Sequence, residues 1–148
     1  MTSPLPHPAA CVLDTHVVLD WVLFDDPRVH DWVDAILNRR VRWIYSAAMQ
    51  DEALRVVHYP ALAKRHDPSV SAQNVAACFA RLGQLCATPP VQQQLVCTDP
   101  DDQMFLDLAL KEHATMLLSR DQAVLHLARR ASSLGLYIGA PEHIGAPR

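Results

Sequence analysis

The chain has 148 residues, a length that suits one domain built around one hydrophobic core. Half of its residues are apolar and a fifth are charged, which is typical of a soluble globular protein, and no apolar run reaches the roughly 18 residues of a membrane span. The formal charge of −3 excludes the strongly basic balance of many nucleic-acid-binding proteins, so any attraction for RNA must come from local basic patches or through metal ions.

The amino-terminal residues, "MTSPLPHPAA", are rich in proline and lack the basic start and long apolar centre of a signal peptide. We therefore expect residues 1–9 to form a loose tail and the protein to be cytoplasmic. The cysteines contain no CxxC pair, and the simplest expectation is reduced thiols. These cysteines are Cys11, Cys78, Cys86 and Cys97.

From residue 10 onward, short apolar runs alternate with helical patterns. The run "ACVLD" predicts a buried strand at 10–14 that ends in Asp14. Such an alternation predicts an α/β fold with a parallel sheet covered by helices on both faces. The elements expected after the first strand are helices over 15–23 and 28–39, a strand at 43–45, a helix over 47–57, a short helix between Pro60 and Pro68, a helix over 71–85, a strand at 94–97, a helix over 100–113, a strand at 115–119, a helix over 122–132 and a strand at 136–138.

Aspartates follow three of the expected strands. Asp14 closes the first strand, residues 99–102 contain three aspartates after the third, and Asp121 follows the fourth. Parallel sheets bind ligands just beyond the carboxyl ends of their strands, so these acids lie where a site is expected. Each aspartate could instead cap the helix that follows it, and Asp99 before Pro100 fits such a cap.

Glu52 is harder to explain as a structural residue. It lies six residues into the helix expected over 47–57, too far in for a cap, and glutamate is rarely buried unless it is paired. Its neighbours on the helix face that should pack on the sheet are Ala48, Met49, Ala53 and Val56.

Convergence of these acids would require a cation. Two carboxylates ~4 Å apart repel by roughly 4 kcal/mol at an effective dielectric constant near 20. A divalent ion removes this repulsion, and hard oxygen ligands suit Mg²⁺ or Mn²⁺. The acids expected to converge are Asp14, Glu52, Asp102 and Asp121.

Three segments resemble the ordered motifs of the PIN domain. "VLDTHVVLDWVL" is similar to its opening strand and helix, "SAAMQDEALRVV" to its second motif, and "DPDDQMFLDLALKEHATMLLSRD" to its third and fourth motifs in the branch of toxin–antitoxin toxins. The resemblance covers roughly residues 10–145 as a single domain. It implies a three-layer α/β/α sandwich around a mostly parallel five-stranded sheet, with the first strand central, and a metal-dependent endoribonuclease that cuts RNA and pairs with an antitoxin.

The resemblance also implies which residues act. The family's four acids fall on Asp14, Glu52, Asp102 and Asp121, which would be the catalytic residues and would bind Mg²⁺ or Mn²⁺. Asp102 is preferred to Asp101 because it lies seven residues before Ala109, as in the family, although the choice between the two stays open. Asp99 then acts as the helix cap. The residues expected to support the site are His16, which replaces the family's asparagine, Asp101 and Ser119.

Two other functions remain possible from the sequence. A receiver-like signalling domain also has acids after its first and third strands and Ser or Thr after its fourth, but this chain has no lysine after Lys111 and such a domain leaves Glu52 unexplained. A PIN scaffold that has lost catalysis and only binds a partner is the other alternative. In either PIN case, the helices over 15–23 and 28–39 are the expected surfaces for an antitoxin or for a homodimer, through Val18, Trp21 and Val22.

Overall fold

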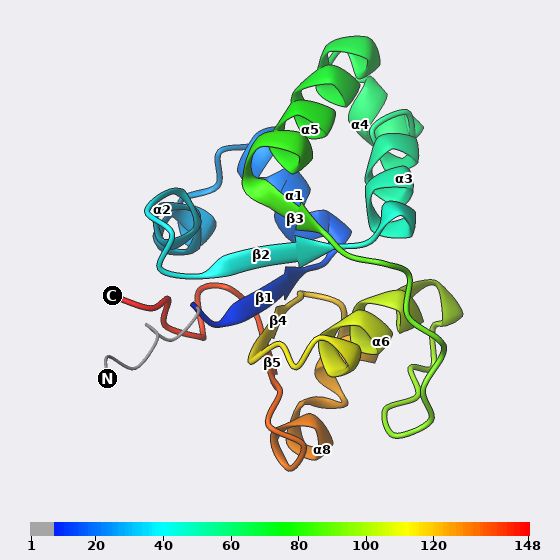
Figure 1. Ribbon diagram of the computed structural model, residues 1–148. Helices are drawn as coiled ribbons and strands as arrows, with labels where there is room; N and C mark the ends of the chain where they lie inside the picture. The colour runs from blue at the N-terminus through cyan, green and yellow to red at the C-terminus, as the bar shows by residue number, and fades with distance from the viewer. Residues whose placement is uncertain (1–7) are drawn as a thin grey trace.

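The computed structural model describes residues 8–148, so most of the expected tail lies outside the described residues. One sheet holds five strands in the order β3-β2-β1-β4-β5, and all neighbouring strands run parallel (Figure 1). The expected parallel sheet with a central first strand is confirmed. The strands are β1 (Ala10–Leu13), β2 (Arg42–Tyr45), β3 (Gly83–Leu85), β4 (Met116–Leu118) and β5 (Tyr137–Gly139). Receiver-like domains have the different order 2-1-3-4-5, so that alternative is excluded.

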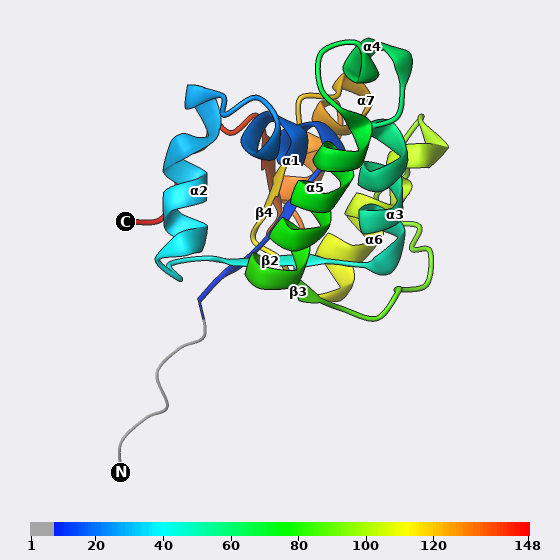
Figure 2. The same ribbon diagram turned by 90° about the horizontal axis from the view of Figure 1, so that it is seen from above.

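Helices cover both faces of the sheet. The helices α1, α3 and α5 pack together on one side, and α6 and α8 lie on the other (Figures 1 and 2). No helix within residues 8–148 has the length and apolar character needed to cross a membrane. The helices are α1 (Thr15–Val22), α2 (His30–Leu37), α3 (Ala47–Val56), α4 (Pro60–Ala63), α5 (Pro68–Leu82), α6 (Gln103–Lys111), α7 (Gln122–Leu125) and α8 (Ala128–Ser132), with 3-10 turns η1 (Pro27–Val29) and η2 (Pro100–Asp102).

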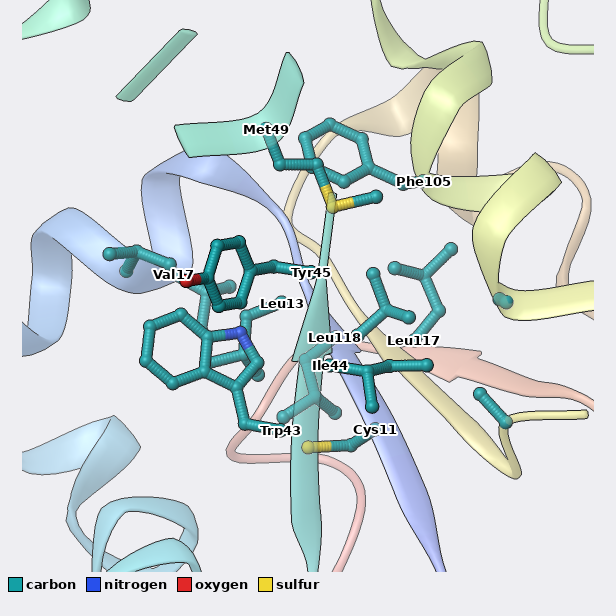
Figure 3. Packing of buried hydrophobic residues seen from close by; sticks show 14 of the residues in the cluster. Cys11, Leu13, Val17, Trp43, Ile44, Tyr45, Met49, Phe105, Leu117 and Leu118 are labelled. Atoms are coloured by element: carbon teal, nitrogen blue, oxygen red, sulfur yellow. The ribbon is translucent and has the colours of Figure 1, made fainter. Parts of the chain in front are cut away.

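Aromatic side chains form the centre of the core beneath α1 and α5. The Trp43 ring on β2 lies 4.8 Å from the ring of Phe79 and 5.4 Å from the ring of Trp21, measured between centroids. Tyr45 packs beside Trp43 on the same strand (Figure 3). All four cysteines are free thiols, as expected.

One expected surface feature is wrong in part. Val18 is buried in the core and contributes nothing to an apolar edge on the outside of α1. Trp21 packs on Trp43 but is only half-buried, and together with Val22 and Leu37 it lines an open hollow on the surface. Leu37 at the end of α2 is the exposed large apolar residue of this region.

The third strand lies elsewhere than expected. The helix expected over 71–85 ends at Leu82, and Gly83 turns into extended backbone and begins β3 beside Trp43. Residues 94–97 form no strand. Leu95 and Cys97 are buried and Val96 is exposed, which imitates the alternation of a strand.

Glutamine side chains replace the backbone pairing of this segment. The Gln92 Oε1 atom accepts hydrogen bonds from the backbone N–H groups of Gln94 and Leu95. The Gln103 Oε1 atom accepts from the N–H of Cys97, and its amide nitrogen donates to the carbonyl of Leu95. The segment therefore needs no neighbouring strand to satisfy its polar groups.

Replacing Gly83 by alanine should lower stability by roughly 1–3 kcal/mol through overpacking. A Cβ atom at Gly83 would lie 2.6 Å from the Tyr45 ring and 2.9 Å from the Phe79 carbonyl oxygen. The matched control is Gly145→Ala, because nothing lies within 4 Å of a Cβ there. Urea unfolding measures both variants, and equal stabilities would contradict the tight junction between α5 and β3.

Candidate metal and active site

Asp14 is held firmly at the carboxyl end of the central strand. It caps α1, since its Oδ1 atom accepts the Val17 N–H at 3.0 Å, and its Oδ2 atom accepts the Ser119 hydroxyl hydrogen. Only 4% of Asp14 is exposed. Burial raises the pKa of Asp14, while the hydrogen bonds from Ser119 and Val17 oppose that rise. The residue therefore combines the cap role with a position at the candidate site.

Ser119 links Asp14 to Asp121. Pairing of β1 with β4 aligns Leu13 with Leu118, which brings the next residue of each strand together. The Ser119 oxygen also accepts the Asp121 N–H at 3.1 Å. Asp121 in turn caps α7 through the Ala123 N–H at 2.9 Å. Ser119 therefore contacts both the Asp14 carboxylate and the backbone of Asp121.

The tightest group of acids contains one residue that the sequence assigned only as a cap. One carboxylate oxygen each from Asp99, Asp102 and Asp121 lie within 4.8 Å of one another. Asp99 does cap η2, through the Asp101 N–H at 3.0 Å, but the same 3-10 turn carries its carboxyl group to Asp102. Asp101 is exposed and contributes no oxygen to this group. A proline between two acids is the only sequence signal for such a turn.

Asp102 is the most perturbed member of the group. Burial raises its pKa to about 7, and contact with Asp121 and the charges of Asp99 and Asp14 add to the rise. Its Oδ2 atom is shielded from solvent and has no hydrogen-bond partner among the described residues.

Glu52 lies outside the tight group but close enough to Asp14 and Asp101 to interact with their charges. Burial raises its pKa, and the charges of Asp101 and Asp14 raise it further, while Thr15 and Arg55 oppose the rise. Its Oε2 atom is also shielded and unpartnered within residues 8–148. Two shielded carboxylate oxygens without donors are costly, and a divalent cation satisfies such oxygens. The donor set, all carboxylate oxygen, therefore fits Mg²⁺ or Mn²⁺.

Two basic residues border the site. His16 is exposed, and its charged form lowers the pKa of Asp14. Arg120 did not stand out in the sequence; its Nε atom donates to Asp20 on α1 at 2.9 Å, and its Nη1 atom donates to Glu142 after β5. These ion pairs tie the loop that carries Ser119 and Asp121 to both neighbouring segments.

The raised pKa values predict how stability depends on pH. Unfolding returns Asp102 from a pKa of about 7 toward 3.8, and the pKa values of Asp14 and Glu52 fall as well. The unfolded state thus binds fewer protons between these values, so the metal-free protein should lose stability as pH rises from about 4 to 7. Urea unfolding in EDTA at pH 5 and pH 7.5 measures this, and Asp102→Asn should reduce the difference. Greater stability at pH 7.5 than at pH 5 would contradict the clustered acids.

An α/β/α fold with acids gathered at the carboxyl edge of its sheet is typical of one family of nuclease-type hydrolases. The model of the PIN domain matches residues 10–123, and the chain belongs to the PIN-domain family. No curated protein gives a match.

Two solved structures share the fold. A chain of VapBC2 from Rickettsia felis, bound to a DNA fragment from its promoter, aligns with a TM-score of 0.60 and 13% identity over 87% of this chain and 96% of that chain. PAE2754 from Pyrobaculum aerophilum aligns with a TM-score of 0.59 and 13% identity over 91% and 88%.

Proposed function

We propose that this protein is a divalent-metal-dependent endoribonuclease and the toxin of a type II toxin–antitoxin pair. The observation that carries the proposal is the group of Asp99, Asp102 and Asp121 at the carboxyl edge of a PIN-domain sheet, with a shielded and unpartnered Asp102 oxygen. The likeness to VapBC2 supports an antitoxin protein as partner. We further propose that the protein acts in the cytoplasm and forms a homodimer.

The acidic residues would have different roles in the reaction. Asp14, Glu52, Asp102 and Asp121 would hold Mg²⁺ or Mn²⁺, with Asp99 beside them. A bound ion would stabilise the negative charge that develops on the scissile phosphate. Glu52, with a raised pKa, is suited to take a proton from the water whose oxygen attacks phosphorus. Hydrogen bonds from Val17 and Ser119 hold the Asp14 carboxylate in place, so Asp14 occupies a fixed position relative to the sheet.

The second candidate is a PIN scaffold that binds a partner without cutting RNA. His16 favours it, because the family resemblance calls for asparagine at that position. A histidine there still donates a hydrogen bond, but it also binds transition metals.

Cleavage of a labelled single-stranded RNA in Mn²⁺, and its loss in EDTA, tests the proposal. Asp14→Asn should remove most of the activity, because no other residue on the central strand replaces this carboxylate. Asp31→Asn, on the exposed face of α2, is the matched control and should cut like the wild type. Cleavage that survives EDTA, or a fully active Asp14→Asn variant, would refute the assignment. Absence of cleavage together with tight binding of a partner protein would favour the scaffold.

A further inference from the structure

A cavity of about 250 Å³ lies beside the acid site, between the start of α3 and the start of α6. Its polar lining comes from Ser46, Thr88, Gln103 and Asp107, and its apolar walls include Val91 and Met104. Pockets with apolar walls and a few convergent polar groups are typical of small-molecule and base recognition. The volume suits one planar heterocycle rather than a longer ligand.

Asp107 is a buried acid whose charge no cation offsets. Only 5% of the residue is exposed, and no lysine, arginine or histidine among residues 8–148 forms an ion pair with it. Its Oδ1 atom accepts from the Gln92 backbone, the Gln92 amide and the Gln103 amide. Its Oδ2 atom accepts nothing within the described residues. A buried carboxylate with one unused oxygen at a cavity is an acceptor for a ligand that donates hydrogen bonds.

Ser46 supplies a second polar group at the cavity. It is 1% exposed and precedes α3, yet its hydroxyl makes no capping hydrogen bond to that helix. Gln103, by contrast, has both ends of its amide engaged. The cavity thus offers one obligate acceptor, the Asp107 carboxylate, and one hydroxyl that can donate or accept.

The cavity shares its walls with the elements of the acid site. Gln103 directly follows Asp102 in the chain. Ala48, which also lines the cavity, lies four residues before Glu52 and so on the same face of α3. One turn of helix, ~5.4 Å, separates the two sites on α3. The base of a nucleotide and its own phosphate are separated by a comparable span.

We infer that this cavity is a base-binding subsite for the RNA strand, selective for bases that carry an exocyclic amino group next to a ring acceptor, namely adenine, cytosine and guanine, over uracil. The inference rests on the proposed ribonuclease function and adds the base-reading part of that site. The exocyclic amine donates to Asp107 Oδ2, and the Ser46 hydroxyl donates to the neighbouring ring nitrogen. Val91 and Met104 contact the faces of the ring. Uracil presents carbonyl oxygens on both sides of its N–H, and a carboxylate repels them.

Binding, measured apart from cleavage, tests this subsite. Fluorescence anisotropy in EDTA compares labelled hexanucleotides of adenine, cytosine and uracil. The wild type should bind the adenine and cytosine strands about tenfold more tightly than the uracil strand. Asp107→Asn keeps an oxygen for the two glutamines and offers an N–H₂ group in place of Oδ2, so the preference should disappear or turn toward uracil. Asp31→Asn removes the same charge from an exposed position and should keep the wild-type preference.

A second variant covers the case in which Asp107→Asn does not fold. Ala48→Phe, at an exposed position of the first turn of α3, should fill the cavity and abolish the preference while the acids stay in place. Equal binding of the three strands by the wild type, or a preference unchanged in both variants, would overturn the subsite. Cleavage of RNA in Mn²⁺ with no base preference would leave the nuclease standing and overturn only the subsite. A base preference in EDTA without any cleavage in Mn²⁺ would support the subsite and overturn the nuclease.

Discussion

Asp102→Asn is expected to reduce metal-dependent RNA cleavage by at least about a hundredfold, while Asp101→Asn retains activity. Asp102 has a shielded oxygen without a partner and belongs to the tight group, whereas the neighbouring Asp101 is exposed and lies outside that group. An asparagine at 102 keeps the shape but removes the charge that a divalent cation requires. Single-turnover cleavage of a labelled RNA measures both variants side by side.

Metal-linked stability gives an independent readout of the same substitution. At a Mn²⁺ concentration of 100 times the dissociation constant, the wild type should gain about 2.7 kcal/mol in its free energy of unfolding. Asp102→Asn should lose most of this gain at the same Mn²⁺ concentration, and in EDTA at pH 7.5 it should be at least as stable as the wild type because one repelling charge is gone. If Asp101→Asn lost the metal response and Asp102→Asn kept it, Asp101 rather than Asp102 would be the metal-binding residue.

Trp43→Ala should destabilise the protein by about 3–5 kcal/mol. The side chain is 1% exposed and its ring contacts those of Trp21, Tyr45 and Phe79, so its removal leaves a cavity bordered by three elements, α1, β2 and α5. Domains of this size have a total stability of about 5–15 kcal/mol, and such a loss approaches the whole of it at the lower end. Urea unfolding in the presence of EDTA measures the difference without a contribution from metal.

Trp43→Phe is the control for this substitution. Phenylalanine keeps an aromatic ring against Phe79 and should recover a substantial part of the loss. A cost below about 1 kcal/mol for Trp43→Ala would mean that the neighbouring rings collapse into the space, and that this cluster is not the centre of the core.

The parallel sheet with a central first strand could be anticipated from the sequence, but the position of β3 could not. Alternation of buried and exposed residues is shared by strands and by loops that are fastened through side chains. Leu95 and Cys97 are buried because Gln92 and Gln103 satisfy the surrounding backbone, and no local pattern predicts that. The junction at Gly83 is short, and its tight contact with Tyr45 depends on a strand 38 positions earlier in the chain.

The sequence predicted which types of residue form the candidate site, but it predicted less well which of the acids lie close together. The acids at the strand ends follow from the rule for parallel sheets, and Asp102 with Asp121 does form a close pair. Asp99 joins them because the short 3-10 turn η2 brings its carboxyl group back beside Asp102. The preference of aspartate for the cap position does not predict this contact. The unused oxygen of Asp107 depends on two glutamines, one of them 15 residues away, and has no sequence signature.

The pairing of β1 with β4 has a consequence for how the chain is made. Asp14 and Ser119 are hydrogen-bonded partners separated by 105 residues. Contacts of such long range form late, because the entropy cost of closing the loop between the two residues comes before their contact stabilises the chain. During synthesis, which proceeds from the amino terminus, the central strand has emerged long before its partner exists. The acids can therefore meet only when about four fifths of the protein has been translated, so that a nascent or prematurely terminated chain carries no assembled acid site.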